Sequence, residues 1–302
     1  MLTVSRHPVK SPPVPGFVPH DWPHRAASLA IEAGGVRWHV QRAGRGPVVL
    51  LLHGSGASSH SWADLLPVLT DRATVVAPDL PGHGFTSGIR DGDCTLTRVA
   101  TAIDRLLEAL ALGPVRVVAG HSAGAALAIR WALGTPRPSA SLVGFAPSLV
   151  PPPALYTTFL APIVTPVATS AFATSLLASL AGRARLVDRL LDSTRSPIPA
   201  AQRARYETLF RSPGHVRGTM RFMAAADLPA LLEDAKRLTV PATFILGRND
   251  DWVPERSLRP ILARAFPDAA IETWDDGHLL HEVEPERAAR VIAGWLPAKA
   301  RS

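Results

Sequence analysis

Short apolar runs alternate with helical segments along most of the chain, and this alternation restricts the fold more than any other feature of the sequence. Residues 48–52 are all apolar, as expected for a strand buried on both faces. Further strands are predicted at 74–78, 115–119, 141–147, 242–246 and 270–274. Helices are predicted at 61–70, at 96–110, from Ala123 onward, at about 255–265 and at 285–296. This order is typical of an α/β fold with a mostly parallel, doubly wound central sheet flanked by helices.

Three segments depart from the alternation. Residues 1–25 contain six prolines and are expected to form an extended arm. Residues 27–44 form two alternating runs around Gly34-Gly35, which predicts a β-hairpin. Residues 138–182 contain no Asp, Glu, Lys or Arg, and their prolines favour short helices; helical signal then continues to about residue 232. We therefore expect an N-terminal arm (1–25), an α/β core (26–147 and 233–302) and an inserted helical cap or lid (148–232).

Composition excludes several classes of protein. Apolar residues make up 47% and charged residues 19% of the 302 residues, which excludes disorder as the main state. The single cysteine, Cys94, excludes a disulfide framework or a thiolate zinc site and favours a cytoplasmic protein. The net charge of +7 is spread along the chain without a basic run, so we expect no nucleic-acid partner. The N-terminal residues lack a signal peptide, and no apolar run is long enough to predict a transmembrane helix.

A serine lies on a glycine-flanked turn between a predicted strand and a predicted helix. Residues 120–124 read Gly-His-Ser-Ala-Gly. Such a turn holds the hydroxyl of Ser122 clear of the sheet, and the glycines permit the tight backbone. Because a serine hydroxyl is a poor nucleophile near neutral pH, it needs a base and a group that orients the base. The alternative is a glycine-rich turn with an incidental serine.

An acid and a histidine follow in the order that this chemistry requires. Asp250 comes after the strand at 242–246, and His278 lies in a loop after the strand at 270–274. Asp251 is the alternative orienting acid, and His281 is the alternative base. Because all three predicted residues follow strand ends, we expect Ser122, His278 and Asp250 to form a catalytic triad.

Backbone N–H groups are also needed to stabilise an oxyanion. Ala123, directly after the nucleophile, and Ser55, in the loop after the strand at 48–52, are the predicted donors. His53 and His121 are expected to support the turns. His60 and His83 are predicted either to line the pocket or to lie at its rim. This chemistry needs no metal and no organic cofactor.

These motifs resemble those of the α/β-hydrolase superfamily, and the resemblance covers about residues 26–296. It implies a structural role for Asp79 in the stretch VVAPDLPGHGFT, where it holds loops near the active site. Haloalkane dehalogenase and epoxide hydrolase activities are disfavoured, because those relatives have an acidic nucleophile where this chain has Ser122. The stretches HGSGASSHSWADLLP, APDLPGHGFT and GHSAGAALAIR also resemble the magnesium-chelatase accessory proteins of bacteriochlorophyll biosynthesis. That resemblance implies a place in magnesium-tetrapyrrole metabolism and magnesium-chelatase subunits as partners. The chain lacks a phosphate-binding G-x-x-x-x-G-K-[ST] loop, so it is not the ATP-hydrolysing part.

The uncharged stretch 138–182 lies where a lid would cover the nucleophile. Its apolar side chains either bury the lid against the core, line a cavity for a large flat or lipid-like ligand, or rest on a membrane as a peripheral contact. Three arginines follow this stretch, Arg183, Arg185 and Arg189. They are expected either to attract an anionic group of the ligand or to form a solvated helix face. The predicted function is a serine hydrolase acting on an ester-like bond of a large apolar or tetrapyrrole-type molecule. The alternatives are a non-catalytic porphyrin-binding or chelatase-assisting protein, and a general esterase or C–C hydrolase.

Overall fold

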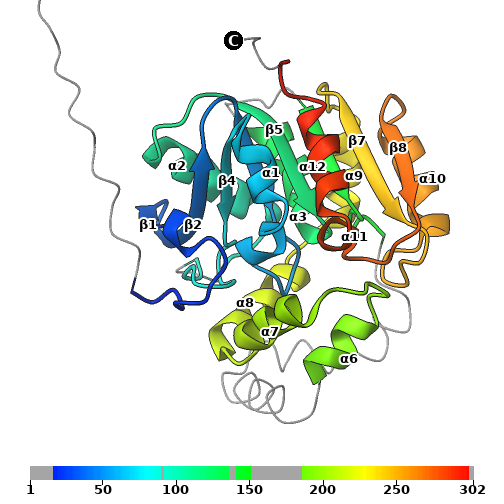
Figure 1. Cartoon of the computed structure of the whole chain (residues 1–302). Helices are drawn as coiled ribbons and strands as arrows, with labels where there is room; N and C mark the ends of the chain where they lie inside the picture. Colours follow the sequence, from blue (N-terminus) through cyan, green and yellow to red (C-terminus); the bar gives the residue numbers. More distant parts are fainter. Residues whose placement is uncertain (1–15, 90–91, 136–140, 151–185, 299–302) are drawn as a thin grey trace, which may run out of the picture.

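The computed structural model describes residues 16–89, 92–135, 141–150 and 186–298. Its described strands form a single sheet in the order β1-β2-β4-β3-β5-β6-β7-β8 (Figure 1). The strands β1 and β2 form a hairpin that pairs antiparallel with β4, and all other neighbours are parallel. The predicted mostly parallel sheet is therefore confirmed. The strands are β1 (Ser28–Ala33), β2 (Val36–Gly44), β3 (Val48–Leu52), β4 (Thr74–Pro78), β5 (Val115–His121), β6 (Ser141–Phe145), β7 (Ala242–Gly247) and β8 (Ala270–Trp274).

Helices cover both faces of this sheet. One face packs against α2, α3, α9 and α10, and the other packs against α1 and α12. Along β3, Leu50 and Leu52 enter the first core, whereas Val49 and Leu51 enter the second. Burial on both faces explains why this strand contains no polar residue. The helices of these two layers are α1 (Leu66–Thr70), α2 (Leu96–Ala109), α3 (Ala123–Gly134), α9 (Leu228–Ala235), α10 (Glu255–Ala265) and α12 (Pro285–Ala293).

A helical segment lies between β6 and β7, as the sequence predicts. Its helices α6 (Leu186–Asp192), α7 (Ala200–Phe210) and α8 (Pro213–Ala224) gather at one end of the sheet, below the core in Figure 1. The last helix before β7 is α9, which instead packs on α3 and contributes Leu231 and Ala235 to the main core. It spans residue 232, where the sequence predicts the end of the cap. Residues 151–185, which include most of the uncharged stretch, Arg183 and Arg185, lie outside the described residues.

Two predicted elements differ from the structure. Residues 61–70 do not form one helix: a 3₁₀ turn, η2 (Ser59–Trp62), precedes α1. The side chain of Ser58 caps η2, and Pro67 in the first turn starts α1 anew. The prediction of an extended arm over residues 1–25 is also wrong for its last part. Val18 and Trp22 are buried and pack with Leu209 and Phe85, and the short turn η1 (Arg25–Ala27) follows them. Burial of these apolar side chains fixes residues 16–24 on the core.

Candidate active site

Ser122 occupies a strained turn between β5 and α3. Its backbone has φ 51° and ψ −119°, a conformation that costs a non-glycine residue about 1–3 kcal/mol. Two hydrogen bonds hold it: the N–H of Ser122 donates to the carbonyl of Phe145 at 2.9 Å, and the N–H of Ser148 donates to the carbonyl of Ser122 at 3.1 Å. The turn is thus fixed by β6 and the residues that follow it.

Steric crowding explains the glycines on either side of the serine. A Cβ atom on Gly120 would lie 2.3 Å from the carbonyl oxygen of Gly124. A Cβ atom on Gly124 would lie 2.2 Å from the carbonyl oxygen of Leu52 in β3. Any larger residue would push α3 away from the sheet, so the spacing of this motif follows from the packing of the first turn of α3 on β3 and β5.

The structure brings Ser122, His278 and Asp250 into one hydrogen-bonded chain. The hydroxyl of Ser122 lies 2.9 Å from Nε2 of His278, and Nδ1 of His278 lies 2.8 Å from Oδ2 of Asp250. Both His278 and Asp250 are buried. The other carboxylate oxygen of Asp250 accepts the N–H groups of Trp252 and Val253 at 2.8 and 2.9 Å. These bonds assign the proton on the imidazole to Nδ1 and leave Nε2 to accept the serine proton.

The two alternative residues make other contacts. Asp251 is exposed and forms an ion pair with Arg195 at 2.7 Å. His281 lies in α11 (Leu280–Val283), where Nε2 is 2.8 Å from the hydroxyl of Ser61. Neither residue touches Ser122 within the described part of the chain, so the geometry favours Asp250 and His278.

The loop that carries His278 is held by the inserted segment as well as by the core. The N–H of His278 donates to the carbonyl of Thr194 at 2.8 Å, and the N–H of Leu279 donates to the hydroxyl of Ser196 at 2.8 Å. The carbonyl of His278 accepts Nε2–H of His121 at 2.9 Å. Thr194 and Ser196 could not be predicted from the sequence, since they lie in a break between α6 and α7 where continuous helical signal was predicted.

Two backbone donors lie beside the nucleophile. Ala123 is the first residue of α3, so no earlier helical turn receives its N–H. The loop of Ser55 approaches Ser122 closely, because a Cβ atom on the adjacent Gly54 would lie 3.2 Å from Cβ of Ser122. Among the described residues, neither the N–H of Ser55 nor that of Ala123 donates a hydrogen bond. Both N–H groups are therefore left without a partner in this part of the chain.

Eight of the ten histidines among the described residues are buried, and several surround these loops. His53 accepts the N–H of Leu80 and donates to the carbonyl of Gly54, both at 2.8 Å, and so braces the Ser55 loop. His60 and His83 are buried rather than at an exposed rim, and Nε2 of each has no hydrogen-bond partner among the described residues. Burial lowers the pKa of both well below the ordinary value, and lowers the pKa of His215 to about 4. Neutral imidazoles therefore line this part of the interior near pH 7.

Asp79 holds neighbouring loops, as the resemblance implies. Its carboxylate accepts the N–H of Ser59 at 2.7 Å, the N–H of Phe85 at 2.9 Å and Nδ1 of His39 at 2.8 Å. Burial alone would raise the pKa of Asp79, but the His39 imidazole and these hydrogen bonds hold it well below its usual range. Asp79 thus joins η2, β2 and the loop after β4 beneath the site.

A second buried pair joins the inserted segment to the core. The hydroxyl of Tyr206 in α7 donates to Oε1 of Glu282 in α11 at 2.5 Å. Burial is the main cause that raises the pKa of Glu282 to about 8, and it also raises the pKa of Tyr206 well above its ordinary value. Glu282 is therefore a neutral acid near pH 7 in the folded protein.

Comparison with known proteins identifies the family. The sequence profile of the alpha/beta hydrolase family matches residues 49–293. The chain belongs to the alpha/beta hydrolase family. This alpha/beta hydrolase is 35% identical to the magnesium-chelatase 30 kDa subunit of Rhodobacter capsulatus over 284 residues, which cover 93% of this chain and 99% of that protein.

Two further relatives extend the comparison. The alpha/beta hydrolase is 31% identical to the pimeloyl-[acyl-carrier protein] methyl ester esterase of Methylococcus capsulatus over 274 residues, covering 85% of this chain and 97% of the esterase. The crystal structure of an enol-lactonase from Burkholderia xenovorans LB400 superposes with a TM-score of 0.72 at 18% identity, covering 88% of this chain and 99% of the lactonase. At that identity the lactonase shows the shared fold alone.

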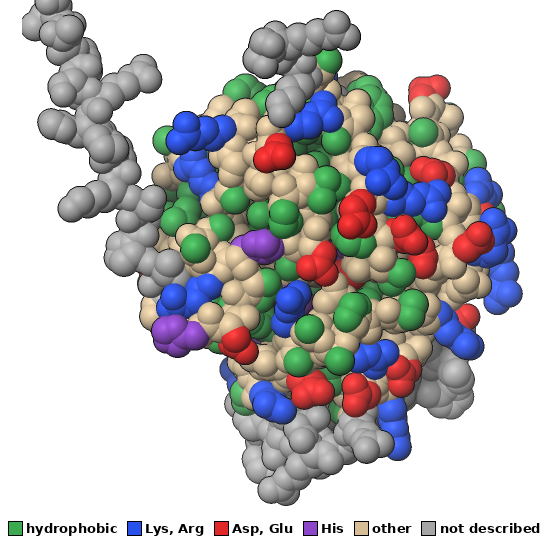
Figure 2. Space-filling view, viewed as in Figure 1, with side chains coloured by type: hydrophobic (Ala, Val, Ile, Leu, Met, Phe, Trp, Pro, Cys, Tyr) green, Lys and Arg blue, Asp and Glu red, His purple; other side chains and the backbone are tan. Residues whose placement is uncertain are grey.

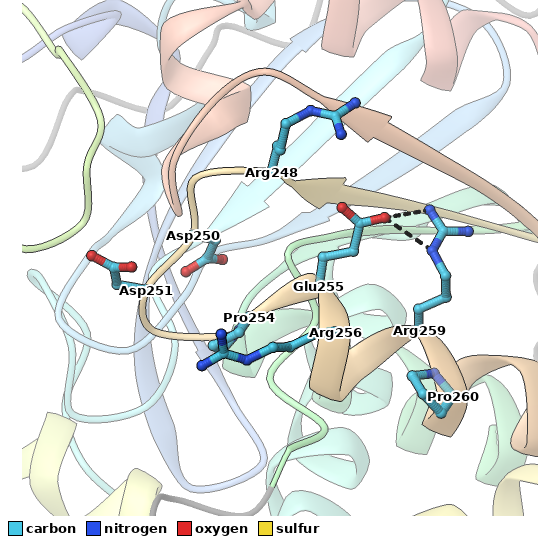
Figure 3. A pocket seen from close by; sticks show the side chains of 8 residues that line it. All are labelled: Arg248, Asp250, Asp251, Pro254, Glu255, Arg256, Arg259 and Pro260. Atoms are coloured by element: carbon cyan, nitrogen blue, oxygen red, sulfur yellow. Dashed lines mark hydrogen bonds and ion pairs between the residues drawn. The ribbon is translucent and has the colours of Figure 1, made fainter.

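An open groove of about 440 Å³ lies on the outer side of the Asp250 loop of this alpha/beta hydrolase (Figure 3). It is lined by charged residues of the loop and of α10, including Arg248, Glu255 and Arg259, and within the described residues neither Ser122 nor His278 lines it. Arg259 and Glu255 pair with each other, and Arg248 pairs with Asp275. Basic and acidic side chains also intermingle over the face drawn in Figure 2. The groove is thus separate from the nucleophile.

No three His, Cys, Asp or Glu side chains of the described residues are grouped so that they could hold a metal ion. In the same part of the chain, every helix is too short or too polar to cross a membrane.

Proposed function

We propose that this alpha/beta hydrolase is a serine hydrolase that cleaves an ester-like bond, with Ser122 as nucleophile, His278 as general base and acid, and Asp250 as the orienting acid. The observation that carries the proposal is the hydrogen-bonded chain from Ser122 through His278 to Asp250, with both distances below 3 Å. The strained backbone of Ser122 supports it further, because such conformations persist only where the surroundings impose them.

The proposed reaction follows from this arrangement. The oxygen of Ser122 attacks the carbonyl carbon while its proton moves to Nε2 of His278. Asp250 accepts the Nδ1–H bond throughout and stabilises the imidazolium. The negative charge on the carbonyl oxygen is met by the N–H groups of Ser55 and Ala123. His278 then returns the proton to the departing alcohol, and water, activated by the same histidine, releases the acid from Ser122.

The substrate class rests on the relatives. The name of the pimeloyl-[acyl-carrier protein] methyl ester esterase describes an enzyme that acts on a methyl ester, and the name of the 30 kDa relative refers to magnesium chelatase. We propose an ester of a large apolar molecule, of the magnesium-tetrapyrrole type used in bacteriochlorophyll biosynthesis, with magnesium-chelatase subunits as partners. The predicted cap over 148–232 would cover such a molecule. A general esterase or C–C hydrolase with the same three residues is the alternative enzymatic assignment.

A fluorophosphonate probe tests the catalytic proposal directly, because it adds covalently to a serine that a working base activates. We expect one adduct by intact mass on the wild-type protein and none on Ser122→Ala. Ser148→Ala is the matched control, since Ser148 follows β6 nearby and should leave labelling intact. A wild-type protein that stays unlabelled, or a Ser122→Ala variant that is labelled equally, would contradict the proposal.

The similarity to a protein named as a magnesium-chelatase subunit favours a second candidate, a porphyrin-binding or chelatase-assisting protein that does not use its triad. Genetic rescue separates the two. If pigment formation in cells that lack the protein needs Ser122, the hydrolase is supported. Equal rescue by wild type and Ser122→Ala, with binding of protoporphyrin by the pure protein, supports the non-catalytic role. Failure to bind protoporphyrin or its magnesium complex favours an esterase outside tetrapyrrole metabolism.

A further inference from the structure

We propose that Trp252 is a positioning residue of this site, whose indole holds the His278 imidazole in its orientation and favours its charged form. The inference rests on the proposed function, since it assigns a role beside the proposed base. The ring centroids of Trp252 and His278 are 5.2 Å apart, and the two rings are inclined by 30°. This is a tilted arrangement, at a centroid distance within the range in which an aromatic face attracts a cation.

Trp252 is anchored at both ends. Its backbone N–H donates to Oδ1 of Asp250 at 2.8 Å, and its indole Nε1–H donates to the hydroxyl of Ser193 at 3.1 Å. The first bond joins the backbone of Trp252 to the same carboxylate that holds the imidazole, and the second joins the indole to the loop after α6. The position of the ring over His278 is therefore fixed by polar contacts and not by burial alone.

The exposure of Trp252 argues against a purely structural role. Its side chain is 41% exposed, in a chain where Trp38, Trp62, Trp131 and Trp274 are almost completely buried. A large apolar side chain that leaves so much surface in water contributes less to folding than those core residues do. Among the described residues, the ring contact of its indole is with the imidazole of His278.

Among the described residues, the other groups in contact with the imidazole carry no positive charge near pH 7. Asp250 accepts from Nδ1, Ser122 donates to Nε2, and the ring of His121 lies 4.9 Å from that of His278 at an angle of 59°. Burial is the main cause that lowers the pKa of His121 well below its ordinary value, and it lowers the pKa of His281 to about 3. Both neighbouring imidazoles are neutral near pH 7.

These contacts act on the proton-transfer step. When Ser122 attacks, its proton moves to Nε2 and His278 becomes a cation. The indole face carries negative electrostatic potential and attracts that cation more strongly than the neutral ring. Trp252 therefore stabilises the transition state more than the ground state, which affects kcat more than KM.

Replacement of Trp252 by Leu tests the role, with Trp252→Phe as the conservative variant. We expect Leu to lower kcat about two- to five-fold, to leave KM unchanged, and to move the acid limb of the kcat/KM profile on a p-nitrophenyl ester to lower pH by about half a unit. Phe should restore part of both effects. Phe17→Leu is the matched control, because Phe17 is also an exposed aromatic beside a buried histidine, His39, and should change neither quantity.

Two results would overturn the inference: an unchanged pH profile in Trp252→Leu, or a change confined to KM, which would make Trp252 a substrate contact. A second readout does not depend on turnover. The NMR signal of the His278 ring Cε1–H, identified by its loss in His278→Gln, should titrate at lower pH in Trp252→Leu. If fluorophosphonate and ester assays are negative but this titration moves, the proposed function fails while the positioning contact stands. If labelling succeeds and the titration does not move, the proposed function stands and the positioning role of Trp252 fails.

Discussion

Glu282 should make the stability of the folded chain fall as pH rises. In the unfolded chain a glutamate ionises near pH 4.5, whereas the folded protein holds the proton of Glu282 until about pH 8. Between those values the folded state binds one more proton than the unfolded state, so the free energy of unfolding decreases with pH. One proton corresponds to about 1.4 kcal/mol per pH unit, or about 3 kcal/mol between pH 5.5 and 7.5.

The variant Glu282→Gln isolates this contribution. Glutamine keeps an acceptor for the Tyr206 hydroxyl but has no proton to lose, so it removes the dependence without removing the contact. Urea unfolding at pH 5 to 8, followed by circular dichroism, gives the free energy for each protein. The free energy of unfolding of the variant should rise relative to that of the wild type by about 1.4 kcal/mol per pH unit. Taking the difference cancels the other titrating groups, including the buried histidines.

Glu233→Gln provides the matched control, because the side chain of Glu233 is 74% exposed and pairs only with Lys236 on the surface. It should change the free energy by a few tenths of a kcal/mol at most, without a trend in pH. If the curves of wild type and Glu282→Gln run parallel from pH 5 to 8, the acid is not held neutral in the folded protein and the reasoning is wrong.

Three other changes have expected outcomes. Asp250→Asn should lower ester turnover by about 10³- to 10⁴-fold, because it stabilises the wrong tautomer of the imidazole. Asp251→Asn should keep turnover within a few-fold of wild type. Comparable losses of the two variants in steady-state assays would contradict the assignment. Gly124→Ala should destabilise the fold by about 3 kcal/mol or more in thermal unfolding, because its Cβ atom would meet backbone atoms. Gly113→Ala is the control, because its Cβ atom would meet nothing within 4 Å. Equal melting temperatures of the two variants would refute the steric argument. His215 has a pKa of about 4 in the folded state, so it favours unfolding as pH falls from about 6.5 toward 4. In urea titrations over that window, His215→Gln should lose about 3 kcal/mol less of its free energy of unfolding than the wild type. An equal loss in the two proteins would count against a neutral buried imidazole.

The sheet and the ends of its strands could be predicted because they depend on local pattern. The bounds predicted for β4, β8 and α10 match the structure, since each element has a clear apolar period and a turn or proline at its ends. The same pattern placed Ser122, Asp250 and His278 after β5, β7 and β8, which run parallel in one half of the sheet with β6 between β5 and β7. Parallel strands bring their carboxyl ends to one edge, so sequence order alone was enough to predict their proximity.

Contacts between distant segments could not be predicted in the same way. The burial of Val18 and Trp22 depends on Leu209, which lies in the inserted segment. The stack of Trp252 on His278 depends on the path of two loops, and each loop alone carries only a tryptophan or a histidine. Likewise, Thr194 and Ser196 have no motif, since it is their backbone position after α6 that brings them to the His278 loop. Sequence identifies which residues can perform the chemistry, and tertiary packing decides which others hold them.

The hydrogen bonds that Thr194 and Ser196 accept from the loop of His278 have a consequence for how such chains can be recombined. Inserted segments between the two halves of a sheet are natural units to exchange when a new substrate range is sought. In this chain the exchangeable unit cannot include residues 193–196, because they form part of the support of the proposed base. A chimera that replaces the insertion but retains this short stretch keeps its proton-transfer apparatus. A chimera that also replaces residues 193–196 must rebuild the support of the proposed base.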